Sequence, residues 1–279
     1  LKAFLRFPYE TESDRVYLDK IMKASMISPY YQMVSSSKEV LLPEVERRYE
    51  RTVHLIKRER YLQPLQNEQA DYYTVSEWKM NDEARLFQMF KLMETMDMPC
   101  AYCVSMQAVE YKEKVEEDLG NIMSLLRKAV RPKLSSSGAG GVGLKEKDEN
   151  ADMALDYYKD LLERLSESPH FKVDIQVMAD EKNLARFLLD AAASEALEEG
   201  MYDFVSYTGG FSVELSGEGL FESADPEAPK RLTYLPHLFT LEEMAPFSCF
   251  PALYNGEQIE IPKETVPELE DHGLYLGQS

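Results

Sequence analysis

The chain has 279 residues, of which 44% are hydrophobic and 29% charged, a mixture that can bury a substantial core. Fifty acidic residues against 31 basic ones give a formal net charge of −19 and an isoelectric point near 4.7. A field of that sign repels phosphate backbones and anionic membrane surfaces. We therefore expect a soluble chain that binds protein partners or itself, without direct nucleic-acid binding and without membrane insertion.

The cysteine count and the N-terminal residues predict a cytoplasmic location. Three cysteines are too few for a disulfide framework, and an odd, low number is typical of a reducing compartment. Residues 1–8 lack the apolar core of a signal peptide, because Arg6 and Pro8 interrupt them. No apolar stretch approaches the roughly 18–20 residues that span a bilayer.

Residues 1–80 are predicted to form an N-terminal α/β subdomain. Its expected elements are a strand at 1–7, a helix capped by Ser13 or Asp14 that stops before Ser28, and a strand at 30–34. The charged stretch 44–60 is either a solvated helix throughout or holds a short strand at 52–56, whose β-branched residues permit one. The sequence leaves these two alternatives open.

Residues 81–215 carry clearer periodicity and predict a domain with helices packed on a sheet. The expected elements are a helix capped by Asn81 or Asp82, a strand at 101–106, a helix at 109–130, a flexible loop at 133–150, a helix at 152–165, a strand at 171–178, a helix at 181–199 and a strand pair at 202–215. The fold class is therefore α/β or α+β, with a mixed sheet. Residues 216–279 are rich in proline and are predicted to be a wrapping segment or a small β module.

A glycine motif at Gly138, Gly140 and Gly143 matches the spacing G-x-G-x-x-G. A dinucleotide-binding loop needs a strand directly before the motif and a helix directly after it, and neither is predicted here. A phosphate-binding P-loop needs Gly-Lys followed by Ser or Thr, and the chain contains no Gly-Lys pair. The motif is therefore interpreted as part of the linker, and no nucleotide-binding or other cofactor-binding residue is assigned.

Cys100 and Cys103 form the pattern C-x-x-C at the entry to a predicted strand. A redox pair prefers a helix N-terminus, and a zinc site needs two further ligands. The remaining candidate ligands are Cys249, His54, His170, His237 and His272. Buried small apolar side chains are the preferred interpretation of the pair, with a metal site that includes Cys249 as the alternative. No catalytic residue is assigned, because the sequence contains neither G-x-S-x-G nor H-E-x-x-H.

Trp78 follows closely on Tyr72 and Tyr73. The three aromatic side chains could form an exposed contact surface or belong to the core. The sequence does not choose between these two interpretations.

Two C-terminal segments resemble HerA/FtsK-type motor ATPases, a family that includes conjugative secretion motors. The segment 235–247 reads Leu-Pro-His-Leu-Phe-Thr-Leu-Glu-Glu-Met-Ala-Pro-Phe, and 250–253 reads Phe-Pro-Ala-Leu. In that family a Leu-Pro pair, then Glu-Glu-Leu-Ala, and a later Leu-Pro precede the motor domain. The final residues 272–279 resemble the strand that leads into the P-loop of the motor.

The resemblance implies that this chain is the N-terminal accessory region of an ATP-driven translocase, truncated before the P-loop. The P-loop, the acidic strand that holds Mg²⁺ and the arginine finger would then follow Ser279, so ATP and magnesium would belong to the full-length protein, which the resemblance implies is a hexameric ring. This segment would contribute partner docking or oligomerisation. The alternative is a stand-alone acidic interaction module or regulatory subunit that binds a basic partner.

Overall fold

The computed structural model describes residues 2–5, 11–25, 33–35, 49–63, 72–96, 98–109, 113–130, 134–136, 142–144, 148–208, 234–249 and 274–278. Its centre is a five-stranded sheet formed by β3 (Arg51–Lys57), β7 (Cys100–Val109), β10 (His170–Ala179), β12 (Tyr202–Thr208) and β13 (Leu238–Thr240). All pairings of this sheet are antiparallel among the described residues. Together with the helices, they confirm the α+β class.

The other described elements lie outside this sheet. They are β1 (Lys2–Leu5), α1 (Glu12–Ser25), β2 (Met33–Ser35), β4 (Glu59–Leu62), β5 (Tyr72–Val75), β6 (Lys79–Met80), α3 (Phe87–Thr95), α4 (Glu113–Val130), β8 (Leu134–Ser136), β9 (Val142–Leu144), α5 (Glu149–Glu167), α6 (Lys182–Ala196), β11 (Leu197–Glu199), α7 (Leu241–Met244), β14 (Leu274–Gln278) and the 3₁₀ turns η1 (Leu235–His237) and η2 (Ala245–Ser248).

Strand β10 is the hub of the sheet. One edge pairs with β7 along all ten residues, from His170 opposite Val109 to Ala179 opposite Cys100. The other edge is shared, because β13 pairs with residues 170–172 and β3 pairs with residues 175–179. Both faces of β10 are buried, so its side chains decide what packs on each side of the sheet.

Alternate residues of β10, from Val173 to Ala179, face helix α6 and form the first core. The stripe of α6 recurs at three- and four-residue spacing and is almost fully buried: Leu184, Ala185, Leu188, Leu189, Ala192, Ala193 and Ala196. Helix α3 packs on α6. We call β3, β7, β10, β12, α3 and α6 the sheet body. The opposite face of β10 is polar at Lys172, Asp174 and Gln176, although all three are buried.

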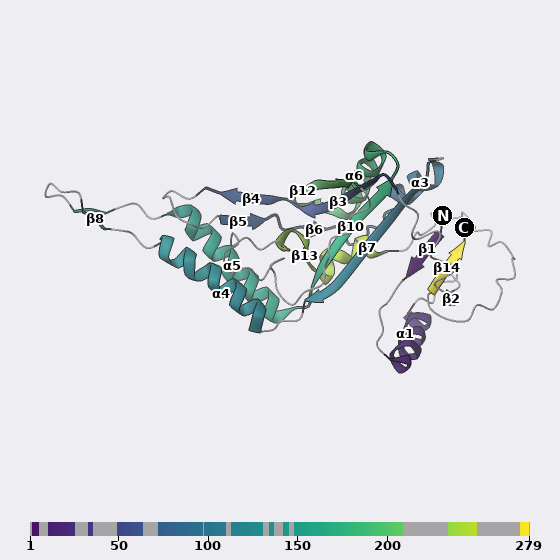
Figure 1. Cartoon of the computed structure of the whole chain (residues 1–279), viewed down its shortest axis with the longest axis horizontal. Helices are drawn as coiled ribbons and strands as arrows, with labels where there is room; N and C mark the ends of the chain where they lie inside the picture. The colour runs from purple at the N-terminus through teal and green to yellow at the C-terminus, as the bar shows by residue number, and fades with distance from the viewer. Residues whose placement is uncertain are drawn as a thin grey trace.

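Strands β4 and β5 and helices α4 and α5 form a second unit, which we call the helical arm (Figure 1). Its helices pack on each other, and α5 packs on the two strands. Their apolar stripes form a separate core that includes Leu119 and Leu126 of α4 and Tyr158 and Leu161 of α5. Figure 1 shows the arm extending away from the sheet body at one end of the molecule, with β8 beyond its tip.

Several predicted boundaries change in the structure. The open stretch 44–60 contains strand β3, whose burial on both faces in the sheet outweighs its local charge. The helix expected to be capped at Asn81 or Asp82 starts only at Phe87, after Leu86 in a left-handed conformation with φ 49°. The Asn81 side chain instead accepts a hydrogen bond from the Glu83 amide, as in a turn.

The expected helix at 181–199 ends at Ala196, and the next three residues form β11, which pairs with β6. The expected flexible loop at 133–150 contains the paired strands β8 and β9 and the start of α5, which Asp148 caps by accepting a hydrogen bond from the Ala151 amide at 3.1 Å. Gly138 and Gly140 lie outside the described residues. Of the expected strand pair at 202–215, only β12 lies within them.

The central sheet contains strands from both sides of position 80, the predicted end of the N-terminal subdomain. Strand β3 precedes that position and pairs with β10 and β12, which follow it. The C-terminal region contributes β13 to this sheet and β14 to a small sheet with β1 and β2. Strands from the two ends of the sequence thus lie side by side (Figure 1).

Gly200 makes the turn between β11 and β12 with φ +124°, a conformation that side chains rarely adopt. A Cβ atom at Gly200 would lie 2.6 Å from Trp78 Cδ1 and 2.8 Å from the Glu77 carbonyl oxygen. We expect Gly200→Ala to lower the free energy of unfolding by about 2–4 kcal/mol, from strain and overpacking together. Urea unfolding followed by circular dichroism measures it.

Gly120 provides the matched control, because it lies in α4 and a Cβ there would meet no atom within 4 Å. Gly120→Ala should stabilise the protein by about 0.5–1 kcal/mol through helix propensity. Equal effects of the two alanine variants would contradict the role assigned to Gly200.

Candidate functional site

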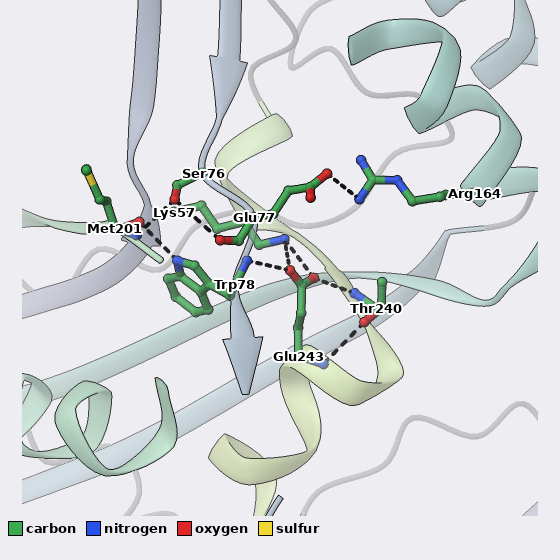
Figure 2. Close-up of polar contacts among 8 residues, drawn as sticks. All are labelled: Lys57, Ser76, Glu77, Trp78, Arg164, Met201, Thr240 and Glu243. Carbon is green, nitrogen blue, oxygen red and sulfur yellow. Dashed lines mark hydrogen bonds and ion pairs between the residues drawn. The ribbon is translucent and has the colours of Figure 1, made fainter. Parts of the chain in front are cut away.

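A buried ion pair lies where the helical arm meets the sheet body (Figure 2). Lys57, the last residue of β3, donates hydrogen bonds from Nζ to both carboxylate oxygens of Glu243, each at 2.7 Å. The two residues are only 5% and 8% exposed. The Lys57 ammonium also lies 4.9 Å from the centre of the Phe239 ring. Two opposite charges are therefore held together away from water.

The segment around Glu243 folds locally through its own sequence. Thr240 and Glu243 form a capping box at the start of α7, in which the Glu243 amide donates to Thr240 Oγ1 at 3.2 Å and the Thr240 amide donates to Glu243 Oε2 at 2.9 Å. The Trp78 amide donates to Glu243 Oε1 at 3.3 Å. The carboxylate thus accepts four hydrogen bonds, which fills its lone-pair sites.

Burial is the main influence on the charge of Lys57. Removal from water lowers the pKa of Lys57, and the adjacent Glu243 carboxylate opposes that effect. Because Glu243 has four donors and Lys57 spends two N–H groups on Glu243, neither side chain is placed to act as a general base or a nucleophile. The arrangement joins β3, the residue before β6 and helix α7.

A small pocket adjoins this pair, with an empty volume of about 310 Å³ that includes open solvent. Its lining residues are Lys57, Val75, Glu77, Tyr157, Leu161, Arg164, His170, Leu235, Leu238, Thr240 and Glu243. At its rim Arg164 Nη1 and Glu77 Oε1 form an ion pair at 2.7 Å, with side chains 38% and 66% exposed. Burial lowers the pKa of His170 and raises that of Tyr157. Its lining combines polar and apolar side chains, and four of the charged ones form the ion pairs Lys57–Glu243 and Arg164–Glu77.

A second polar cluster occupies the other face of the sheet. His54 Nδ1 lies 2.6 Å from Asp174 Oδ1, and both side chains are 1% exposed. Gln176 stands opposite His54 in β3 and opposite Cys103 in β7, so it separates the imidazole from the thiol. A Cys–His nucleophile requires the thiol to contact the ring, and burial here raises the pKa of Cys103. The cluster therefore lacks the arrangement of a thiol nucleophile.

The two cysteines of the C-x-x-C pattern lie on opposite faces of β7, because side chains alternate along a strand. Cys100 packs against the core beneath α6, as does Cys249, whereas Cys103 lies beside Gln176. The pair cannot bind one metal ion together in this geometry. Within the part of the chain that the structure describes, no group of three or more His, Cys, Asp or Glu side chains is arranged to hold a metal.

Two of the histidines that were alternative metal ligands form hydrogen bonds with backbone carbonyl groups. His170 Nδ1 lies 2.9 Å from the Ser168 carbonyl oxygen, and His237 Nδ1 lies 3.1 Å from that of Val173. Since a carbonyl oxygen only accepts, both Nδ1 atoms act as donors. His272 lies outside the described residues.

The aromatic group at 72–78 divides between surface and core. Trp78 is 6% exposed, packs edge-on against Phe239 with ring centres 5.1 Å apart, and donates from Nε1 to the Met201 carbonyl at 3.0 Å. Tyr73 packs on Tyr61 at 5.3 Å. The side chain of Tyr72 lies outside the described residues. Trp78 is therefore a core residue.

The candidate residues predicted from the sequence did not include Lys57, Glu243 or Asp174. The Thr-x-x-Glu spacing at 240–243 is a visible capping-box signal and could have identified Glu243. A charged residue at the end of a strand, such as Lys57, carries no local signal of burial.

No protein-family model, no curated protein and no solved structure matches the chain. None of the helices in the described ranges is long and apolar enough to cross a membrane.

Truncating either member of the buried pair should be costly, because it leaves the other charge without its partner. We expect Lys57→Met and Glu243→Gln each to lower the free energy of unfolding by about 3–5 kcal/mol. The double variant should lose less than the sum of the two, with a coupling of about 0.5–3 kcal/mol. Chemical denaturation of the four proteins measures this cycle.

The exposed pair Lys91–Glu94 serves as the control, at 3.4 Å with side chains 45% and 54% exposed. Lys91→Gln should change stability by less than about 1 kcal/mol. Strict additivity of the Lys57 and Glu243 variants would argue against a coupled pair.

His237 should make the protein less stable in mild acid. Burial lowers the pKa of His237 below its ordinary value of 6.5, although Asp174 and the Val173 carbonyl favour the charged form. Below pH 6.5 the unfolded chain therefore binds a proton that the folded chain resists, and stability falls as the pH falls. His237→Asn keeps a donor for Val173 and should reduce this loss between pH 7 and pH 5. Equal pH slopes for the two proteins would remove His237 as the cause.

Proposed function

We propose that the chain is a non-catalytic accessory region of a HerA/FtsK-type, ATP-driven translocase, in which it serves partner docking or oligomerisation. The observation that carries the proposal is the position of the segment 235–247, the one on which the resemblance mainly rests. This segment forms η1, β13, α7 and η2 and lies between the two cores.

Several positions of that segment have defined contacts, whereas Leu241, Glu242 and Ala245 are exposed. Leu235 and Leu238 belong to the core of the helical arm, whereas Phe239 and Phe247 belong to that of the sheet body. Glu243 binds Lys57. A Leu-Pro motif followed by a capped Glu-Glu pair therefore has a physical role in this fold, as the joint of its two units.

The attachment of the body supports an accessory role. Strand β1 and strand β14 pair antiparallel, so the segments that lead into and out of the α+β body meet in one small sheet. If a larger assembly is attached to the α+β body through this small sheet, the remaining surface of the body is available for binding partners. With a net charge of −19, that surface suits protein partners better than a nucleic-acid backbone.

In this proposal ATP and Mg²⁺ are bound by a motor domain outside this chain, in a cytoplasmic protein that assembles as a ring. The alternative is a stand-alone acidic interaction module. Its supporting observation is the exposed acidic side of α5, at Glu149, Asp156, Asp160, Glu163 and Glu167, which suits a basic partner.

The gene sequence beyond the codon of Ser279 tests the proposal. We expect a strand-like run followed by Gly-x-x-x-x-Gly-Lys-Ser/Thr within a few dozen codons, and magnesium-dependent ATP hydrolysis by the purified full-length protein. Replacing the P-loop lysine should abolish hydrolysis, whereas Glu163→Gln, far from any P-loop, should leave the basal rate unchanged. A stop codon directly after Ser279 would refute the motor assignment and favour the stand-alone module.

A further inference from the structure

The helical arm and the sheet body have separate cores and few connections. Helices α4 and α5 pack on each other, and α5 packs on β4 and β5, whereas α6 packs on β3, β10 and α3. The chain passes between the two units from β3 to β4, from β5 to β6, from β7 to α4 and from α5 to β10. A further link is the segment 235–247, which contributes Leu235 and Leu238 to the arm core.

The two crossings on the strand side are firmly braced. The Arg58 amide donates to the Met201 carbonyl at 3.0 Å, and the Ser76 amide donates to the Arg58 carbonyl at 2.9 Å. The Met201 amide in turn donates to Ser76 Oγ at 2.8 Å. Three segments that are far apart in sequence are thereby bonded in a closed triangle, next to the Gly200 turn. Relative displacement of these three backbones would break these bonds, so this side is fixed.

On the helix side α5 leads directly into β10 and the arm core includes Leu235 and Leu238, but the polar side-chain contact is weaker than on the strand side. Arg164 of α5 reaches Glu77 across the rim of the polar pocket, and both side chains are partly exposed. Arg164 Nε is buried yet finds no hydrogen-bond partner among the described residues. An ion pair at this exposure contributes little and is sensitive to salt. The polar contacts between the two units are therefore strong on the strand side and weak on the helix side, where Figure 2 shows the Arg164–Glu77 pair.

From this asymmetry we infer that the helical arm is hinged on the sheet body, with the Arg58–Ser76–Met201 triangle as its pivot and the Arg164–Glu77 ion pair as a releasable latch. Opening the latch moves α5 away from Leu235 and Leu238 and widens the polar pocket, while the Lys57–Glu243 pair keeps α7 on the sheet body. This inference is independent of the proposed function, since it needs neither a motor domain nor a partner.

Hydrogen exchange measured by mass spectrometry on the whole chain tests the hinge. Glu77→Gln removes the charge of the latch, and we expect about two- to fivefold faster exchange in residues 157–165 and 235–238, the range that a weak ion pair supports. Exchange in α6 and β10 should stay unchanged. Sodium chloride at 0.5 M should accelerate the same residues in the wild type and add nothing to the variant.

Lys159→Gln is the matched control, because it removes the exposed Lys159–Asp156 pair at 2.7 Å, which lies wholly within α5. It should leave exchange at 235–238 unchanged. The hinge is refuted if Glu77→Gln and Lys159→Gln give the same pattern, if Glu77→Gln has no effect, or if α6 exchanges faster together with α5. The last result would mean that the arm and the sheet body open as one unit.

Discussion

The Lys57–Glu243 ion pair is the interaction on which the joint between the two units depends. Transferring two charges out of water costs several kcal/mol each, and this cost is offset only when the partners are close and fully hydrogen-bonded. Here the ammonium spans both carboxylate oxygens, and two backbone amides complete the set. The end of β3, the entry to β6 and the start of α7 are thereby held in one arrangement.

Strand β10 imposes a second constraint, because both of its faces are buried and they differ in chemistry. The face under α6 is apolar, whereas the other contains Lys172, Asp174 and Gln176. Two of these have a specific neighbour: the Lys172 ammonium lies 4.2 Å from the Tyr234 ring centre, and Asp174 contacts His54. Buried polar groups of this kind favour one register over its neighbours, since a shift by one residue would place them in the apolar core.

The parts of the fold that could be predicted from sequence are those with strong local periodicity. Helices α5 and α6 and strand β10 follow from their apolar spacing, because local pattern and burial agree there. Strand β7 also follows from its apolar sequence, although none of its residues is fully buried. The sequence left a helix and a strand open for the residues of β3, because their charged neighbours also suit a helix. The pairing with β10, which is non-local, selects the strand. Helix α3 starts later than predicted because Leu86 adopts a left-handed conformation. A leucine gives no signal of such a conformation, which residues other than glycine rarely adopt.

The candidate site was less accessible to prediction. Glu243 had a local signal in its capping box, but its partner Lys57 lies 186 residues away, and no short-range pattern connects them. The C-x-x-C pair was a candidate site because of its spacing alone, and the alternation of side chains along β7 places the two thiols on opposite faces. Sequence spacing implies proximity only when the secondary structure that carries it is known.

The central position of β10 also affects how the chain can fold during synthesis. Its partners are drawn from residues 51–57, 100–109 and 238–240, so the sheet closes loops of very different lengths. Such non-local pairing slows folding. Until residues 238–240 leave the ribosome, residues 170–172 of β10 lack their β13 partner on one edge, and Lys57 lacks Glu243. A nascent chain at that stage therefore has an open strand edge and an uncompensated charge, the kind of intermediate that chaperones bind.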